Sequence, residues 1–159
     1  MKALTIHQPW ASLIAHGEKR FETRSWAPGA ALDRFELIAI HAGTAKGPKP
    51  DHAPTGLVVK TERIIGHQPW SVLPRGAVIA IARYKYVAQT EQVRGYPTSF
   101  GLGWHDMEFA CGDFRPERYA WRLEPVLVLD EPIPAQGRQK LWNWEPPAEI
   151  VEQIRGVVR

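Results

Sequence analysis

Proline and glycine interrupt this chain at short intervals, and that spacing limits what the chain can fold into. The 159 residues include 14 Pro and 13 Gly, about 17% together against a usual sum of roughly 12%. Proline breaks a helix interior and glycine weakens one. The composition therefore favours many short elements joined by turns, and it argues against a bundle of long helices.

Hydrophobic patterning places the expected elements between these breaks. Strands are predicted at residues 3–6, 19–26, 35–41, 77–87 and 119–129, the last interrupted at Pro125. Short helices are predicted at the two ends, over 7–16 and 147–158. Segment 57–65 fits a helix or a strand, and 42–56 and 88–116 are interpreted as loops. Because helices and strands do not alternate regularly, we predict an α+β fold with a small mixed or antiparallel β-barrel.

Several classes of protein are disfavoured by composition. The single cysteine, Cys111, excludes an intrachain disulfide and a multi-thiolate zinc site. The six His have no clustered acidic or thiol partners, so we predict neither a metal nor a cofactor. The N-terminus lacks the pattern of a secretory signal, and no apolar stretch approaches 18 residues. We expect one cytoplasmic domain over residues 1–159, with no membrane contact.

Charge and tryptophan content indicate the kind of ligand. The net charge of +3 is weak support for nucleic acid, but 13 of the 20 basic residues are Arg, which binds phosphate and stacks on rings better than Lys. Seven Trp are present, and aromatic side chains beside Arg suit single-stranded or flipped-out bases. Our candidates for base contact are Trp26, Trp121, Trp142 and Trp144. The alternatives are a Trp-rich core and, for the last two, a plug that seals the barrel end.

A charged segment lies at residues 17–26. Alternation along a strand places Arg20, Glu22 and Arg24 on one face together with Trp26. Lys19 can share a site with Glu22 only if it lies in a turn after Gly17, whose backbone tolerates unusual conformations. The segment fits the wall of a cleft, whereas on pattern alone a solvated edge strand with paired charges is the more common arrangement.

The same segment resembles the ASCH (activating-signal-cointegrator homology) domain. The resemblance rests on the helix HQPWASLIAHG, on the spacing Gly-x-Lys-x-x-Glu-x-Arg that begins at Gly17, and on four later pieces in order: IHAG at 40–43, PRGA at 74–77, GDF at 112–114 with YAW at 119–121, and LWNW at 141–144. It implies a PUA-like β-barrel with a cleft beside the charged segment. Members of this group have been linked to RNA or DNA binding, to ribonuclease activity and to hydrolysis of acetylated cytidine amides.

Two departures from the family pattern matter. In the amidohydrolases a Thr nucleophile follows the motif Lys by three positions, and here that position is Glu22, with Thr23 one residue later. A Thr-nucleophile mechanism is therefore disfavoured. In addition, residues 95–107 resemble an insertion that could cover or extend the cleft.

These residues allow three functions. We predict a nucleic-acid-binding module, for RNA, another single strand or a modified nucleoside. In it Lys19 contacts phosphate, Glu22 contacts a base amino group, and Arg24 either binds phosphate or anchors Glu22. The first alternative is a metal-independent hydrolase of an acylated cytidine amide or of single-stranded RNA, with Lys19 and Glu22 as the catalytic pair. The second is a protein-interaction scaffold that uses the insertion. His41 is either a site residue or a structural histidine, and the charged cluster could also only stabilise the barrel.

Overall fold

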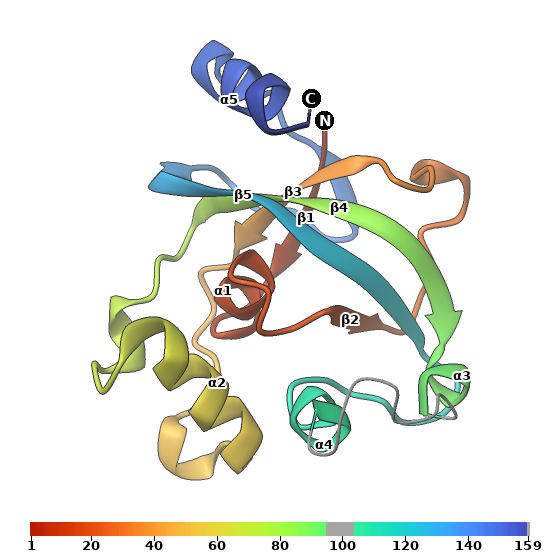
Figure 1. Ribbon diagram of the computed structural model, residues 1–159, viewed down its shortest axis with the longest axis vertical. Coiled ribbons are helices and arrows are strands. Elements are labelled where there is room, and N and C mark those ends of the chain that lie inside the picture. The colour runs from red at the N-terminus through yellow and green to blue at the C-terminus, as the bar shows by residue number, and fades with distance from the viewer. Residues whose placement is uncertain (95–103, 159) are drawn as a thin grey trace.

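A curled sheet of mixed strands forms the frame of the molecule in the computed structural model, which describes residues 1–94 and 104–158 (Figure 1). The strands are β1 (Lys2–Ile6), β2 (Phe21–Arg24), β3 (Leu37–Ala42), β4 (Ala77–Gln89), β5 (Tyr119–Pro134) and β6 (Leu141–Asn143). The helices are α1 (Trp10–Ala15), α2 (Thr55–Ile65), α3 (Thr90–Arg94), α4 (Trp104–Phe109) and α5 (Ala148–Val158), with 3-10 turns at Gly29–Ala31, Pro50–His52 and Trp70–Val72.

Strand order in the sheet is β2-β5-β4-β3-β1-β6. β1 runs parallel to β3, and the other neighbouring pairs are antiparallel. The long strands β4 and β5 bend strongly along their length, so that the sheet forms a half-barrel (Figure 1). Their register shifts at several points, and such bulges increase local twist and bending.

The prediction that the strand is interrupted at Pro125 is wrong. β5 continues through this residue, which lies opposite Ala82 next to a register shift. A proline lacks the N–H that a regular ladder needs, and an irregular position of this kind tolerates that loss. The strand therefore bends at Pro125 where the sequence pattern had suggested an interruption.

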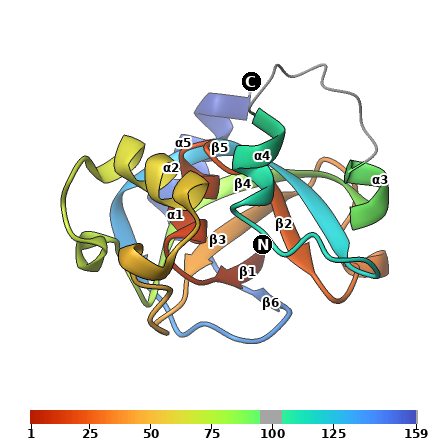
Figure 2. The same ribbon diagram turned by 90° about the horizontal axis from the view of Figure 1, so that it is seen from below.

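Helices cover the two faces of the sheet in different ways. α1 lies inside the curl and packs on a core that includes Leu4, Ile40 and Trp121, while α2 packs on the outer side of α1 (Figures 1 and 2). α5 covers the opposite face, where Ile150 packs with Trp142 and Trp144. The hollow of the half-barrel is thus closed by α1 and is bordered by the loops that follow it.

The α+β prediction, with a short N-terminal helix and a C-terminal helix on a small mixed sheet, is confirmed. Segment 57–65 is a helix, and the region interpreted as a loop at 88–116 contains α3 and α4. The insertion predicted at 95–107 lies mostly outside the described residues, as does any contact surface on it. Within the described ranges, no helix combines the length and the apolar character that a membrane span requires.

Candidate functional site

A cavity of about 440 Å³ opens between β2 and the carboxyl end of β1. Segments from distant parts of the chain line it: Ile6, His7, Trp10, Lys19, Glu22, Thr23, Arg24, Pro48, Pro54, Leu57, Ala110, Cys111, Gly112, Asp113 and Arg118. Ligand pockets usually measure roughly 300–1,000 Å³. The three residues singled out in the charged segment, Lys19, Glu22 and Arg24, therefore share one concave surface.

Lys19 lies almost completely buried in the turn that precedes β2. Gly17 ends the α1 region with a φ of +75°, a conformation that glycine adopts readily, and the Lys19 N–H donates to Leu13 O at 3.0 Å. The side chain is 1% exposed, donates from Nζ to Phe21 O, and lies 3.8 Å from Glu22 Oε2. An ammonium group carries three donors, so Lys19 retains donor capacity for a ligand.

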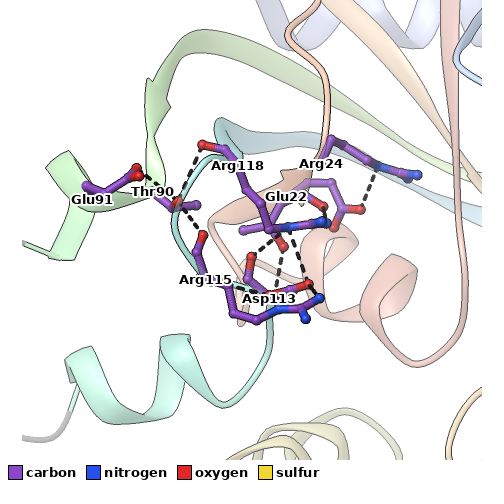
Figure 3. Close-up of polar contacts among 8 residues, drawn as sticks. Glu22, Arg24, Thr90, Glu91, Asp113, Arg115 and Arg118 are labelled. Atoms are coloured by element: carbon purple, nitrogen blue, oxygen red, sulfur yellow. Dashed lines mark hydrogen bonds and ion pairs between the residues drawn. The ribbon is translucent and has the colours of Figure 1, made fainter.

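Glu22 and Arg24 form the next ion pair, from adjacent positions on one face of β2 (Figure 3). Arg24 Nε is 3.0 Å from Glu22 Oε1, yet its N–H has no aligned acceptor among the described residues. Arg24 Nη2 donates to Thr5 O at 2.7 Å, which joins β2 to β1 across the curl of the sheet. The Arg24 side chain remains 26% exposed.

A second charged group borders the cavity from the loop after α4 (Figure 3). Asp113 pairs with Arg115 at 2.6 Å and with Arg118 at 3.4 Å, and its N–H donates to Thr23 Oγ1 at 2.9 Å. Hydrogen bonds from Arg115 lower the pKa of Asp113 to about 2. Among the described residues, the cavity lining therefore carries three cationic side chains, of Lys19, Arg24 and Arg118, and two carboxylates that are already paired.

A buried ion pair fixes the start of β2 beneath the cavity. Glu108 Oε1 accepts the N–H groups of Arg20 and Phe21, both at 2.9 Å, and Glu108 Oε2 lies 3.2 Å from Lys60 Nζ. The two side chains are 2% and 3% exposed. Lys60 also donates to Glu18 O. We refer to Lys60 and Glu108 as the β2 clamp, because they hold the backbone that presents Lys19 and Glu22.

The four candidate indoles do not line this cavity. Trp121 is fully buried and donates from Nε1 to Trp26 O at 3.2 Å, and the two rings meet edge to face. Trp142 and Trp144 are buried against α5, which is the core position weighed as the alternative. The rings of Trp121, Trp142 and Trp144 are buried and offer little face to a base. Trp26 is partly exposed but does not line the cavity, so we leave the four indoles out of the proposed binding surface. Among the described residues, the indole that lines the cavity is that of Trp10, which is half-buried.

His41 lies outside the cavity, at the end of β3. It is 1% exposed, its Nε2 lies 2.9 Å from Ala135 O, and its Nδ1 has no partner among the described residues. Burial lowers the pKa of His41 below its ordinary value of 6.5. This placement agrees with a structural role for His41, because the residue does not line the main cavity.

Acidification is expected to destabilise the protein through His41. The unfolded chain binds a proton at this residue near pH 6.5 and the folded chain only at lower pH, so stability is lost as pH falls through that interval. We expect the melting temperature to fall between pH 7 and pH 5, and to fall less in His41→Gln. His67→Gln is the control, because that side chain is 95% exposed. An equal pH dependence in wild type and His41→Gln would contradict the assignment.

Several cavity residues escaped the sequence analysis. Asp113 lies within the GDF piece, and His7 begins the HQPWASLIAHG helix, so the resemblance marked both segments without giving either residue a role. Arg118 carried no signal. Cys111 also lines the cavity, but burial raises the pKa of its thiol to about 11. It therefore stays protonated at neutral pH and is a poor nucleophile. The described residues contain no group of three His, Cys, Asp or Glu that could hold a metal ion.

The fold and site define a class: α+β domains whose half-barrel of mixed strands carries a polar cavity beside the first helix. The sequence matches the model of the ASCH domain over residues 4–124. The chain belongs to the ASCH domain family. Proteins with this PUA-like fold are generally associated with RNA binding or hydrolase activity. None of the curated proteins compared with the sequence matches it.

The fold of the chain is similar to that of a solved structure. The chain is similar to a crystal structure of ASCH from Zymomonas mobilis, with a TM-score of 0.50, 16% identity, and coverage of 97% of this chain and 93% of that one. A serine-to-alanine and a tyrosine-to-phenylalanine mutant of the Z. mobilis protein both match with a TM-score of 0.48 and 16% identity. They cover 97% of this chain and 94% and 96% of theirs. At 16% identity, the similarity to the first of these structures supports a shared fold and nothing further.

Proposed function

We propose that the chain binds single-stranded RNA or a modified nucleoside in the cavity around Lys19, Glu22 and Arg24. The observation that carries the proposal is the convergence of three cations, with Arg118 the third, on a concave surface where both carboxylates are already paired. The excess positive charge suits a phosphate or another anionic group. Family membership supports the same class of ligand.

Each side chain has a role that its chemistry supports. Arg24 keeps an Nε–H without an aligned acceptor and is partly exposed, so it can donate to a phosphate oxygen. Lys19 is more deeply buried in the cavity than Arg24 and can bind an anionic or carbonyl oxygen. Glu22 can accept a hydrogen bond from a base amino group. Trp10 provides an indole wall against which a base can stack.

Salt dependence tests the proposal. A fluorescent single-stranded RNA is titrated at several salt concentrations with the wild-type chain and with Arg24→Gln. Three phosphate contacts on a single strand predict a slope of log affinity against log salt of roughly −2. Arg24→Gln is expected to bind about tenfold more weakly and with a shallower slope.

The matched control is Arg155→Gln, since Arg155 is an exposed arginine on α5 with a surface ion pair. It should reproduce the wild-type titration. If the wild type bound neither RNA nor nucleosides at low salt, the proposal would be abandoned. Equal weakening by both variants would assign the binding to bulk charge and would contradict a role for the cavity.

One contact favours hydrolysis as a second candidate. Lys19 Nζ and Glu22 Oε2 lie 3.8 Å apart, both nearly buried and both on the cavity. Such a pair could act on an acylated cytidine amide or on RNA. In the amide case, Glu22 would take the proton of the attacking water, Lys19 would stabilise the oxyanion, and the proton would pass to the leaving amine. Recovery of the ligand after the titration separates the candidates: intact ligand supports binding alone, and cleaved ligand supports hydrolysis.

A further inference from the structure

A second cavity, of about 400 Å³, lies on the other side of His7. Its lining includes Thr5, His7, His41, Thr44, Gln136 and Arg138. His7 is exposed and lines both cavities. The end of β1 is therefore a shared wall, with the main cavity on one side and the second cavity on the other.

Contacts at Thr5 join the two cavities through one residue. Its carbonyl oxygen accepts Arg24 Nη2 at 2.7 Å, from a side chain of the main cavity. Its hydroxyl oxygen accepts Trp142 Nε1 at 3.1 Å, and Thr5 itself lines the second cavity. Because His7 lines both cavities, a ligand that extends from the main cavity across His7 reaches the second one.

The chemistry of the second cavity suits an anionic, hydrogen-bonding ligand. Among the described residues, its lining contains no carboxylate, and the side chains of Arg138 and Gln136 form no hydrogen bond or ion pair. Their side chains are exposed. An arginine without a partner beside amide and imidazole groups can bind a phosphate together with the edge of a base.

The loop that carries Arg138 is held in place by contacts with His41. A Cβ on Gly137 would lie 2.4 Å from His41 Cε1, so the loop backbone packs directly on the His41 ring. His41 Nε2 and Ala135 O are 2.9 Å apart, which ties the same loop to β3. This loop lies beyond residue 124, where the family match ends. The second cavity therefore combines family residues near His7 with a segment outside the matched region.

We propose that the second cavity binds the nucleotide adjacent to the one in the main cavity, with its phosphate on Arg138. The ligand is then a single-stranded oligonucleotide of at least two nucleotides that crosses His7, and not an isolated nucleoside. This inference rests on the proposed function, because it requires the main cavity to bind a nucleotide. It deepens that function by naming the length of ligand that the surface selects.

Length dependence tests the inference. The affinities of a uridine 5′-monophosphate and of the corresponding di- and tetranucleotides are measured by calorimetry at one salt concentration. We expect the wild-type chain to bind the tetranucleotide at least tenfold more tightly than the mononucleotide. Arg138→Gln should lose about tenfold in tetranucleotide affinity and leave mononucleotide affinity unchanged. Arg155→Gln, which removes an equal charge elsewhere, should change neither value.

The outcomes separate this inference from the proposed function. Equal affinities for mono- and tetranucleotide, or an unchanged tetranucleotide affinity in Arg138→Gln, would overturn the second binding site and leave the main cavity's function standing. An equal loss in Arg138→Gln and Arg155→Gln would overturn it as well, because the effect would then be one of total charge. No binding of any of the three ligands by the wild type would overturn both proposals.

Discussion

The variant Lys19→Met is expected to bind single-stranded RNA about 10- to 100-fold more weakly than the wild-type chain. Hydrogen bonds to a charged group contribute roughly 1.5–3 kcal/mol, and 1.4 kcal/mol corresponds to a tenfold change in affinity. Lys19 is the deepest cation of the cavity, so its charge is poorly screened by solvent. Methionine retains the length of the apolar stem and removes only the ammonium group. Equilibrium titration of a labelled RNA measures the effect.

Two comparisons make this result specific to the site. Glu22 keeps its ion pair with Arg24 in Lys19→Met, so a circular dichroism melt should show a folded protein. Lys2→Met removes a lysine that pairs with Asn143 on the surface and should bind RNA as the wild type does. A folded Lys19→Met variant with wild-type affinity would remove Lys19 from the binding site. If Lys19→Met did not fold, Arg24→Gln would still test the cavity.

Glu108→Ala is expected to lower the free energy of unfolding by about 3–5 kcal/mol. Removal of one member of a buried ion pair leaves the other charge without compensation, and this is the usual size of that effect. Here the Lys60 ammonium would lose its carboxylate, and the N–H groups of Arg20 and Phe21 would lose their acceptor. Urea denaturation of the wild type and the variant measures the difference.

A double variant tests the cause of that loss. Replacement of both charges by apolar side chains, in Lys60→Met with Glu108→Leu, removes the unpaired charge and should recover a substantial part of the stability. Recovery should be incomplete, because the two backbone N–H groups still lack an acceptor. Glu152→Ala, at an exposed ion pair, should change stability by about 0.5 kcal/mol at most. A loss below about 1 kcal/mol in Glu108→Ala would contradict the role of the β2 clamp.

Local features of the sequence were sufficient to predict that Lys19 can share one surface with Glu22. Gly17 marks the turn, and the turn places Lys19 on the same cavity as Glu22 although the two residues are three apart. The turn and the position of Lys19 both depend on residues that are close together in the sequence. The strands β1 to β5 were predicted, with shifted ends, because alternation and breakers act over a few positions, whereas the short strand β6 was not predicted.

Residues that reach the site from far along the chain could not be predicted in this way. The contact between Asp113 and Thr23 spans 90 residues, and the one between Glu108 and Arg20 spans 88. No local pattern encodes such pairs. The burial of Trp121 could not be predicted for a different reason: its N–H donates to Trp26 O inside the protein, so its polar group needs neither solvent nor a ligand.

The position of β1 has a consequence for how the chain folds. β1 pairs with β3, where Lys2 opposes Ile38, and with β6, where Ala3 opposes Trp142. Pairing between distant segments slows folding, because loop-closure entropy is lost before the contacts form. During synthesis β1 is made before β3 and β6, so its pairing is completed only after both partners have been made. Until β6 emerges from the ribosome, one edge of β1 is open to pairing with other chains.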